Sequence, residues 1–274
     1  MSSVSEGRIP DSPVRSVTRG PVRAVLRADD GTRIEAVYDP CTAGDGEGAP
    51  AGDPGPAIVV AHGFTGSADR PAVRRAVRAF SRYAAVVTFS FRGHGGSGGL
   101  STVGDREVLD LAAAVDWARS LGHRRVVTAG FSMGGSVVLR HGALYPGGAD
   151  AVVSVSAPAR WYYRGTAPMR RLHWMVTRPE GRLVGRYGFG TRIHHRAWDP
   201  VPLSPVGAAA LIAPAPLLVV HGDRDPYFPL DHPRMLAAAA GDAGELWLER
   251  GMGHAENAAD ESLLTRIADW AVRA

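Results

Sequence analysis

The chain has 274 residues, which is long enough for one large α/β domain or two small ones. Its hydrophobic fraction of 45% and charged fraction of 21% are those of an ordinary soluble globular protein. The formal net charge is only +4, and because no lysine occurs we attribute the excess of arginine to codon bias rather than to a nucleic-acid partner.

The N-terminal segment, residues 1–20, is rich in Ser, Pro and Arg and has no apolar stretch that could serve as a secretory signal. We expect it to be a loose tail. Cys41 is the only cysteine, so no internal disulfide can form, and we interpret it as a surface thiol. With no export signal, no disulfide and no apolar run of 18 residues, we expect a cytoplasmic protein without a membrane span.

From residue 22 onward the chain alternates between predicted strands and helices. A hairpin turn at 29–31 joins strands at 22–26 and 34–38, and a Gly/Pro-rich connector follows at 41–56. Further strands are predicted at 58–61, 85–91, 126–129, 151–156, 217–220 and 246–248, and helices at 70–82, 105–121, 133–145, 233–240 and 263–272. This α/β pattern predicts a mostly parallel, twisted sheet of about eight strands with helices on both faces.

The pentapeptide Gly130-Phe131-Ser132-Met133-Gly134 stands between a predicted strand and a predicted helix. A G-x-S-x-G sequence in that place is typical of a sharp turn that exposes a serine hydroxyl at the end of a sheet. The amides at the start of the helix point toward the same spot, where they can stabilise negative charge. Because a serine hydroxyl alone is a poor nucleophile, Ser132 needs a histidine base and an orienting acid.

Both partners follow in the sequence on loops after predicted strands. Asp223 and Asp225 follow the strand at 217–220, and His254 follows the strand at 246–248. Acidic residues after a parallel strand lie at the carboxyl edge of the sheet, the same edge as Ser132. We assign Asp225 as the acid because it has more loop in which to reach His254, and we expect Asp223 to bond loop backbone.

With the order Ser132, Asp225, His254 in place, the chain resembles the α/β-hydrolase superfamily from about residue 22 to 270. His62-Gly63-Phe64-Thr65-Gly66 is similar to the oxyanion loop of that family, and residues 91–97 are similar to its RGHG-x-S turn. The resemblance implies an oxyanion hole formed by the backbone amides of Phe64 and Met133.

Five further histidines are interpreted as having no catalytic role. We expect His62 to be a structural residue that precedes the oxyanion loop, and His94 to support the site from behind. His173, His194 and His195 could suggest a metal site, but no carboxylate or cysteine stands at ligand spacing, so we predict no metal and no other cofactor.

Between residues 158 and 216 the strand and helix alternation stops. A structureless loop of that length is rare in a compact domain, and α/β-hydrolases often insert a lid at this place. We therefore predict a core of residues 21–157 and 213–274 with a lid insertion at 158–212.

The composition of the predicted lid leaves two interpretations open. It is rich in aromatic residues, among them Trp161, Tyr162 and Trp174, and it has nine arginines against two acidic residues. The aromatic side chains either wall an acyl pocket or seat the lid on the core. The arginines either attract an anionic substrate or form a solvated face, and we favour the solvated face.

Together these features predict a serine hydrolase that cleaves a carboxylic ester of a small-molecule acyl substrate through an acyl-serine intermediate. A thioesterase that acts on a carrier-bound or CoA acyl group is the nearest alternative. A peptidase or amidase could use the same three residues. A non-hydrolytic member of the fold that assists a biosynthetic step is the remaining alternative.

Overall fold

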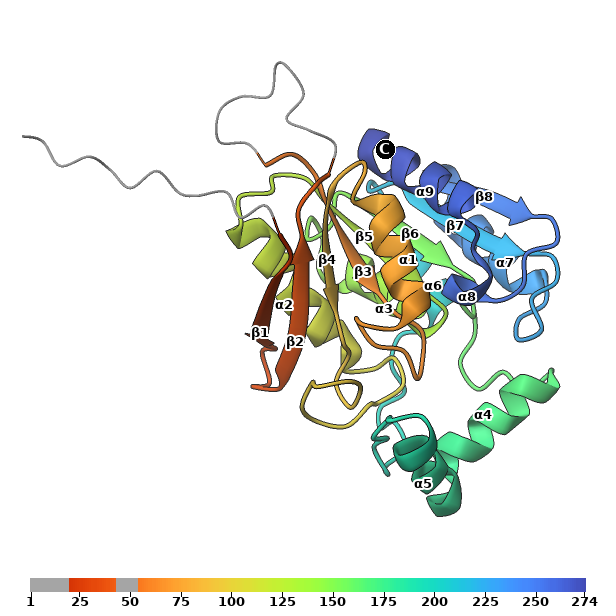
Figure 1. The fold of residues 1–274 in the computed structure, drawn as a ribbon. Coiled ribbons are helices and arrows are strands. Elements are labelled where there is room, and N and C mark those ends of the chain that lie inside the picture. The colour runs from red at the N-terminus through yellow and green to blue at the C-terminus, as the bar shows by residue number, and fades with distance from the viewer. Residues whose placement is uncertain (1–19, 43–53) are drawn as a thin grey trace, which may run out of the picture.

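The structure, a computed structural model, describes residues 20–42 and 54–274 (Figure 1). Its centre is a sheet in the order β1-β2-β4-β3-β5-β6-β7-β8. The strands are β1 (Val22–Arg27), β2 (Arg33–Asp39), β3 (Ala57–Ala61), β4 (Ala85–Phe89), β5 (Val126–Phe131), β6 (Ala151–Val155), β7 (Leu217–Gly222) and β8 (Gly244–Glu249). Strand β2 pairs antiparallel with β1 and β4, and all other neighbours are parallel. The predicted mostly parallel sheet of eight strands is confirmed.

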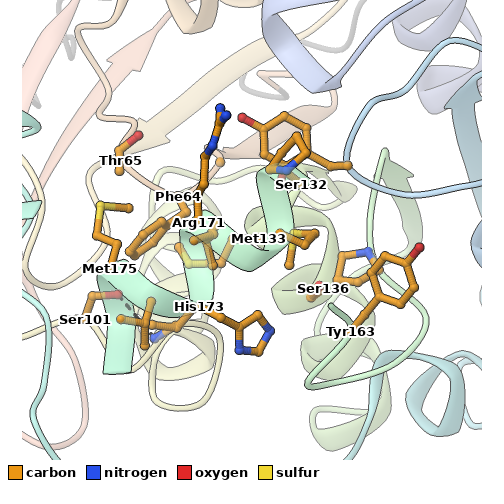
Figure 2. A pocket seen from close by; sticks show the side chains of 18 of the residues that line it. Phe64, Thr65, Ser101, Ser132, Met133, Ser136, Tyr163, Arg171, His173 and Met175 are labelled. Atoms are coloured by element: carbon orange, nitrogen blue, oxygen red, sulfur yellow. Dashed lines mark hydrogen bonds between the residues drawn. The ribbon is translucent and has the colours of Figure 1, made fainter. Parts of the chain in front are cut away.

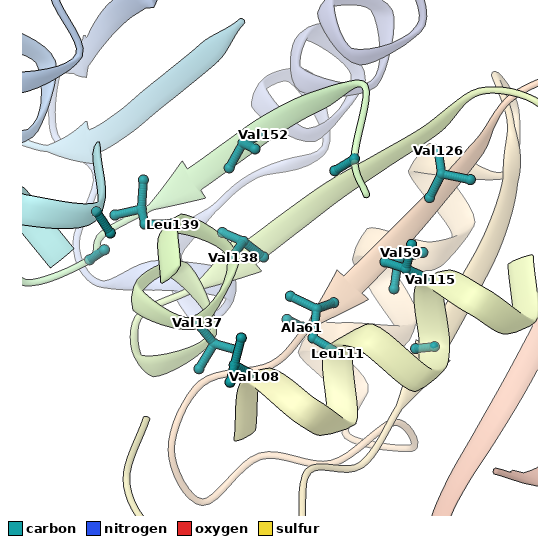
Figure 3. Close-up of a cluster of buried hydrophobic side chains, with 14 of the residues drawn as sticks. Val59, Ala61, Val108, Leu111, Val115, Val126, Val137, Val138, Leu139 and Val152 are labelled. Atoms are coloured by element: carbon teal, nitrogen blue, oxygen red, sulfur yellow. The ribbon is translucent and has the colours of Figure 1, made fainter. Parts of the chain in front are cut away.

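Helices cover both faces of the sheet, as predicted. One face carries α1 (Pro71–Phe80) and α9 (Glu261–Arg273), and the other carries α2 (Glu107–Ser120), α3 (Met133–Leu144) and α7 (Asp231–Ala240). Strand β3 shows why two layers form, since Val59 and Ala61 pack in one cluster while Ile58 and Val60 pack in the other. Figure 3 shows the first cluster, in which side chains of α2 and α3 contact β3, β5 and β6.

Local signals explain where several helices begin. Helix α1 starts with Pro71, whose missing N–H costs nothing in the first turn. Helix α9 starts after Asp260, whose carboxylate accepts a hydrogen bond from the amide of Leu263 at 2.8 Å. The observed bounds of both helices lie within two residues of the predicted ones.

The strand order brings three loops to one edge of the sheet. Strands β5, β6, β7 and β8 are consecutive neighbours, and all four are parallel. Phe131 at the end of β5 pairs with Val155 of β6, and Gly222 at the end of β7 pairs with Glu249 of β8. The segments that follow β5, β7 and β8 therefore meet at the carboxyl edge.

Residues 158–212 contribute no strand to the sheet, and form α4 (Ala167–Thr177), α5 (Pro179–Gly188) and α6 (Pro205–Ala209). Helices α4 and α5 form a pair that projects from the rest of the domain (Figure 1). The chain that follows α5 is hydrogen-bonded to the core. The Ser101 amide donates to the carbonyl of Arg192, and the indole of Trp198 donates to the carbonyl of Thr102. The division into core and lid stays a prediction.

Other sequence predictions concern regions that the structure does not describe or properties that it leaves open. The tail predicted at 1–20 lies almost wholly outside the described residues, as does most of the connector predicted at 41–56. Within residues 20–42 and 54–274, no helix has the length and apolar character needed to cross a membrane. The cytoplasmic location stays a prediction.

Candidate active site

Ser132 lies in the turn between β5 and α3, with φ 52° and ψ −113°. A non-glycine residue in such a conformation costs of the order of 1–3 kcal/mol, so the surroundings must hold it. The Ser132 amide donates to the carbonyl of Val155 at 2.8 Å. A Cβ at Gly130 would collide with the backbone of Gly134, and a Cβ at Gly134 would collide with the carbonyl of Ala61. Both positions therefore have no room for a side chain and require glycine.

His254 lies between Ser132 and Asp225 and contacts both. Its Nε2 is 2.9 Å from Oγ of Ser132, and its Nδ1 is 2.7 Å from Oδ2 of Asp225. Since an ionised carboxylate can only accept, we assign the imidazole proton to Nδ1, which leaves Nε2 to accept the hydrogen bond from the serine hydroxyl. The structure thus brings together all three residues that the sequence predicted as a triad.

The Asp225 carboxyl is completely buried, and it has more than one hydrogen-bond donor. Its Oδ1 accepts from the amides of Tyr227 at 2.7 Å and Phe228 at 3.2 Å, while Oδ2 accepts from His254. Burial alone would raise the pKa of Asp225, but the hydrogen bond and charge of His254 and the Tyr227 amide outweigh it and hold the pKa below its usual value. Asp225 therefore stays ionised beside the imidazole.

Asp223 has a different place on the same loop. Its Oδ1 accepts from the amide of Gly251 at 2.6 Å, which ties the loop after β7 to the loop after β8. Asp223 thus accepts a hydrogen bond from loop backbone, as expected from the sequence, whereas Asp225 contacts His254.

Phe64 and Met133 line the same pocket as Ser132. The amide of Met133 is the first of α3 and has no partner within the helix. The amide of Phe64 has no hydrogen-bond partner anywhere in residues 20–42 and 54–274. Two free backbone donors beside a serine can hold the oxygen of a tetrahedral intermediate.

His62 and His94 support the loop that carries Phe64. Nε2 of His62 accepts from the Phe91 amide at 3.0 Å, and Nδ1 is 2.7 Å from the carbonyl of Gly63. Complete burial, with a further contribution from the charge of His94, lowers the pKa of His62 to about 3, so the ring is neutral at pH 7. His94 accepts from the Thr65 amide at 3.3 Å. Both histidines thus lie where they hold backbone rather than a reacting atom.

A pocket of about 780 Å³ opens over Ser132, between the core and residues 160–198 (Figure 2). This volume is within the range of pockets that take a small organic ligand. The pocket is lined by Trp161, Tyr162 and Trp174, the three residues predicted for substrate binding. The indole of Trp161 also donates to the carbonyl of Pro202 at 3.0 Å, so this side chain seats the segment as well as lining the pocket.

Comparison with known proteins shows the family of the chain. Residues 56–183 match the alpha/beta hydrolase fold family. A monoacylglycerol lipase from Mycolicibacterium smegmatis is 30% identical over 238 residues, which cover 74% of this chain and 79% of the relative. The chain belongs to the α/β-hydrolase family. Within the family it is an enzyme of the esterase and lipase type.

Solved structures agree with the fold. An esterase from Pyrococcus furiosus, Pf2001, superposes with a TM-score of 0.69 at 19% identity, with 96% of each chain covered. Est1E from Butyrivibrio proteoclasticus, solved with ferulic acid bound, has a TM-score of 0.60 at 20% identity and covers 90% of this chain and 97% of its own. At this level of identity the likeness concerns the fold.

The nine arginines of residues 158–212 fall into separate groups. Arg160 pairs with Asp231 at 2.6 Å, and Arg186 lies over the ring of Tyr187. Others donate to backbone carbonyls, namely Arg170, Arg182 and Arg192. Within the described ranges no partner exists for the guanidinium groups of Arg164, Arg171, Arg178 and Arg196, and of these four all but Arg178 line the pocket.

The α/β-hydrolase site shows no metal-binding arrangement. Residues 20–42 and 54–274 contain no group of three or more His, Cys, Asp or Glu side chains placed to hold a metal ion. The rings of His194 and His195 stack on each other with centroids 5.0 Å apart, and both line the pocket together with His173.

Two residues of the pocket were not predicted from the sequence. One is Tyr227, whose ring stacks on His254 with centroids 4.2 Å apart. Glu256 lies deep in the pocket and accepts from the amide of Gly63 at 3.1 Å. Only its position two residues after the predicted base could have drawn attention to Glu256.

Proposed function

We propose that the chain is a serine esterase in which Ser132, His254 and Asp225 form the catalytic triad. The observation that carries the proposal is the continuous set of hydrogen bonds from Ser132 through His254 to Asp225, at 2.9 and 2.7 Å. Hydrogen bonds of this length connect a nucleophile to a base and the base to an acid that orients it.

The first half of the reaction forms the acyl-enzyme. Oγ of Ser132 attacks the ester carbonyl carbon while Nε2 of His254 takes the hydroxyl proton. The amides of Phe64 and Met133 hold the resulting oxyanion, and each such donor contributes about 3 kcal/mol. The carbon–oxygen bond to the alcohol then breaks, and the alcohol leaves with the proton from His254.

The second half releases the acid. Nε2 of His254 takes a proton from water, and the hydroxide adds to the acyl carbon. As the second tetrahedral intermediate collapses, Nε2 gives this proton to Oγ of Ser132, which releases the carboxylic acid and restores the free enzyme. Asp225 keeps the imidazole in the tautomer that can accept at Nε2, and it stabilises the imidazolium that forms in each half.

Residues 158–212 act in this proposal as a lid that walls an acyl pocket. The aromatic lining from Trp161, Tyr162 and Trp174 supports an apolar acyl group as substrate. The relation to a monoacylglycerol lipase supports esters of an acyl chain with a small alcohol as the substrate class. Arg164, Arg171 and Arg196, which line the pocket and have no partner among the residues that the structure describes, favour a second candidate, an acyl thioester whose carrier is anionic.

A rate comparison across acyl donors tests the proposal. We expect p-nitrophenyl esters of medium chain length and monoacylglycerols to be hydrolysed with the highest kcat/KM, acyl-CoA thioesters less well, and matched amides least. The Ser132→Ala variant serves as the blank for each substrate. A higher kcat/KM on acyl-CoA than on every ester would favour the thioesterase instead, and activity confined to amides would contradict both.

A further inference from the structure

Glu256 is a buried carboxylate beside the nucleophile that the proposed mechanism does not use. It lies in the first turn of α8 (Ala255–Ala258), two residues after His254, and is 6% exposed. Its Oε1 accepts from the Gly63 amide at 3.1 Å. Gly63 fits closely between the two side chains, since a Cβ there would lie 3.1 Å from Oε1 of Glu256 and 3.4 Å from Cβ of Ser132.

The turn that carries Glu256 is itself held firmly. Ala255 has φ 53°, and its amide donates to Oγ of Ser156 at 3.1 Å. From the other side, the guanidinium of Arg75 donates to the carbonyl of Glu256 at 2.6 Å and to that of Ala259 at 3.0 Å. The side chain of Glu256 therefore starts from a fixed backbone, and its carboxylate can serve as an anchor for another loop.

Glu256 contacts the loop that carries the amide of Phe64, the proposed oxyanion donor. The N–H of Phe64 and the carbonyl of Gly63 belong to one rigid peptide plane, so whatever orients that carbonyl also orients the proposed oxyanion donor. The carbonyl is held by Nδ1 of His62 at 2.7 Å and by the amide of Gly66 at 3.0 Å. This set fixes the plane on the C-terminal side of Gly63.

The plane on the N-terminal side of Gly63 is fixed by Glu256, through the N–H of Gly63. Glycine has the freest backbone of any residue, so φ and ψ of Gly63 keep one value only if the peptide planes before and after it are both held by hydrogen bonds. Without the carboxylate of Glu256, the peptide plane between His62 and Gly63 would lose this restraint, and the Phe64 amide would lose part of its alignment.

We propose that Glu256 is a positioning residue, whose carboxylate holds Gly63 so that the Phe64 amide points at the oxyanion. The inference rests on the proposed function, since it gives Phe64 the role of oxyanion donor. It joins the loop of the base to the loop of the oxyanion hole through a single side chain. Misplacement of a reacting group by about 1 Å can cost of the order of 100-fold in rate, so the effect is measurable.

Two substitutions separate reach from charge. Glu256→Gln keeps the length and an acceptor oxygen for Gly63 but removes the charge, whereas Glu256→Asp keeps the charge but is one methylene too short. We expect kcat of Glu256→Gln within about fivefold of wild type and kcat of Glu256→Asp about 10- to 100-fold lower, with KM nearly unchanged in both. The rate of fluorophosphonate labelling, in which the phosphoryl oxygen enters the oxyanion hole, should fall together with kcat.

Glu261→Asp is the matched control, because it makes the same change at an exposed glutamate of α9 that does not line the pocket. Its kcat should equal that of wild type. Equal kcat values for wild type and Glu256→Asp, with both folded by thermal unfolding, would overturn the inference, as would a Gln variant that is slower than the Asp variant. Retained activity in Ser132→Ala would instead overturn the proposed function, so the two failures can be told apart.

Discussion

The sheet core and residues 158–212 line one pocket from opposite sides, but they hold their side chains in different ways. In the core, the Asp225 side chain is completely buried and has several hydrogen-bond donors. On α4 and α5, large apolar side chains are exposed, with Leu183 57% and Tyr187 78% accessible. From this difference we expect the core to supply the fixed geometry of the proposed reaction, and residues 158–212 to influence which substrate binds.

The contacts of each region give the physical reason. The loops of Ser132, Asp225 and His254 each follow a strand that is paired with a neighbouring strand, so their positions are set by the register of the sheet. Helices α4 and α5 pack mainly on each other, with Gly181 of α5 close to the backbone of Trp174 and Met175 in α4. Substitutions in the core should therefore change kcat, whereas substitutions in the segment should change substrate preference.

The largest expected effect is that of Ser132→Ala. Removal of the nucleophile should lower kcat by at least about four orders of magnitude, because the base and the acid have nothing left to activate. Stoichiometric labelling by a fluorophosphonate should vanish, while the thermal unfolding midpoint stays close to that of wild type. Labelling at the wild-type level in this variant would show that the nucleophile lies elsewhere.

The two aspartates of one loop provide the next test. Asp225→Asn should lower kcat by about 10³- to 10⁴-fold, since the imidazole loses the acceptor that fixes its tautomer. Asp223→Asn keeps an oxygen that can accept from the Gly251 amide and removes only the charge, so it should cost far less. Steady-state kinetics on one ester with both folded variants gives the answer. A larger loss in Asp223→Asn than in Asp225→Asn would contradict the assignment of the acid.

A third test asks whether acid destabilises the core because a histidine is buried there in its neutral form. Burial lowers the pKa of His141, on α3, to about 4, and its Nδ1 has no partner among the described residues. Between the ordinary histidine value near 6.5 and about 4, the unfolded chain binds this proton and the folded chain does not. The free energy of unfolding should therefore fall as the pH is lowered through this window.

Urea unfolding of wild type and His141→Gln at several pH values measures this contribution. In wild type, His141 should contribute up to about 1.4 kcal/mol per pH unit to the slope inside the window. His141→Gln should reduce the slope by that amount and leave it unchanged above pH 7, where the imidazole is neutral in both states. Parallel curves for the two proteins between pH 4 and 6.5 would contradict the prediction.

The smallest expected effect concerns charge on the segment. Arg171 lines the pocket without a partner among the described residues, and Figure 2 shows it on α4 together with His173. If Arg171 attracts an anionic acyl donor, Arg171→Glu should lower kcat/KM for that donor about three- to tenfold at low salt and leave a neutral ester unaffected. The loss should shrink as salt is added, because exposed charges are screened beyond roughly 8 Å at physiological ionic strength.

Arg178→Glu is the control for this experiment, because Arg178 is also exposed and unpartnered within the described ranges but does not line the pocket. It changes the net charge by the same amount. Equal effects of the two substitutions on the anionic donor would contradict attraction by the pocket itself and favour the solvated-face interpretation of the arginines.

Sequence alone predicted most of the core and its three reactive side chains. Apolar runs located every strand of the sheet, and the spacing around Ser132 indicated the turn, because both depend on interactions between near neighbours in the chain. The choice of Asp225 over Asp223 followed from reach along the loop. The two aspartates do differ in their contacts as that argument expected.

The segment was not predictable in the same way. Helix α5 contains two poor helix formers, Gly181, which allows close packing against α4, and Gly185, which lies against Ile193. Its helicity therefore depends on partners that the local pattern does not reveal. The indole of Trp198 bonds to Thr102, which is 96 residues away in the sequence. Glu256 was missed for the same reason, because its partner Gly63 is 193 residues away.

The separation of Ser132 and His254 by 122 residues also has a consequence for folding. A contact between such distant parts of a chain forms late, since a large loop must close before the contact can stabilise anything. Because His254 follows β8, we expect it to reach Ser132 only after β8 has paired with β7 at the edge of the sheet. We therefore expect hydrolytic activity to recover during refolding only after β8 has paired with β7, so that activity reports the last step of sheet assembly.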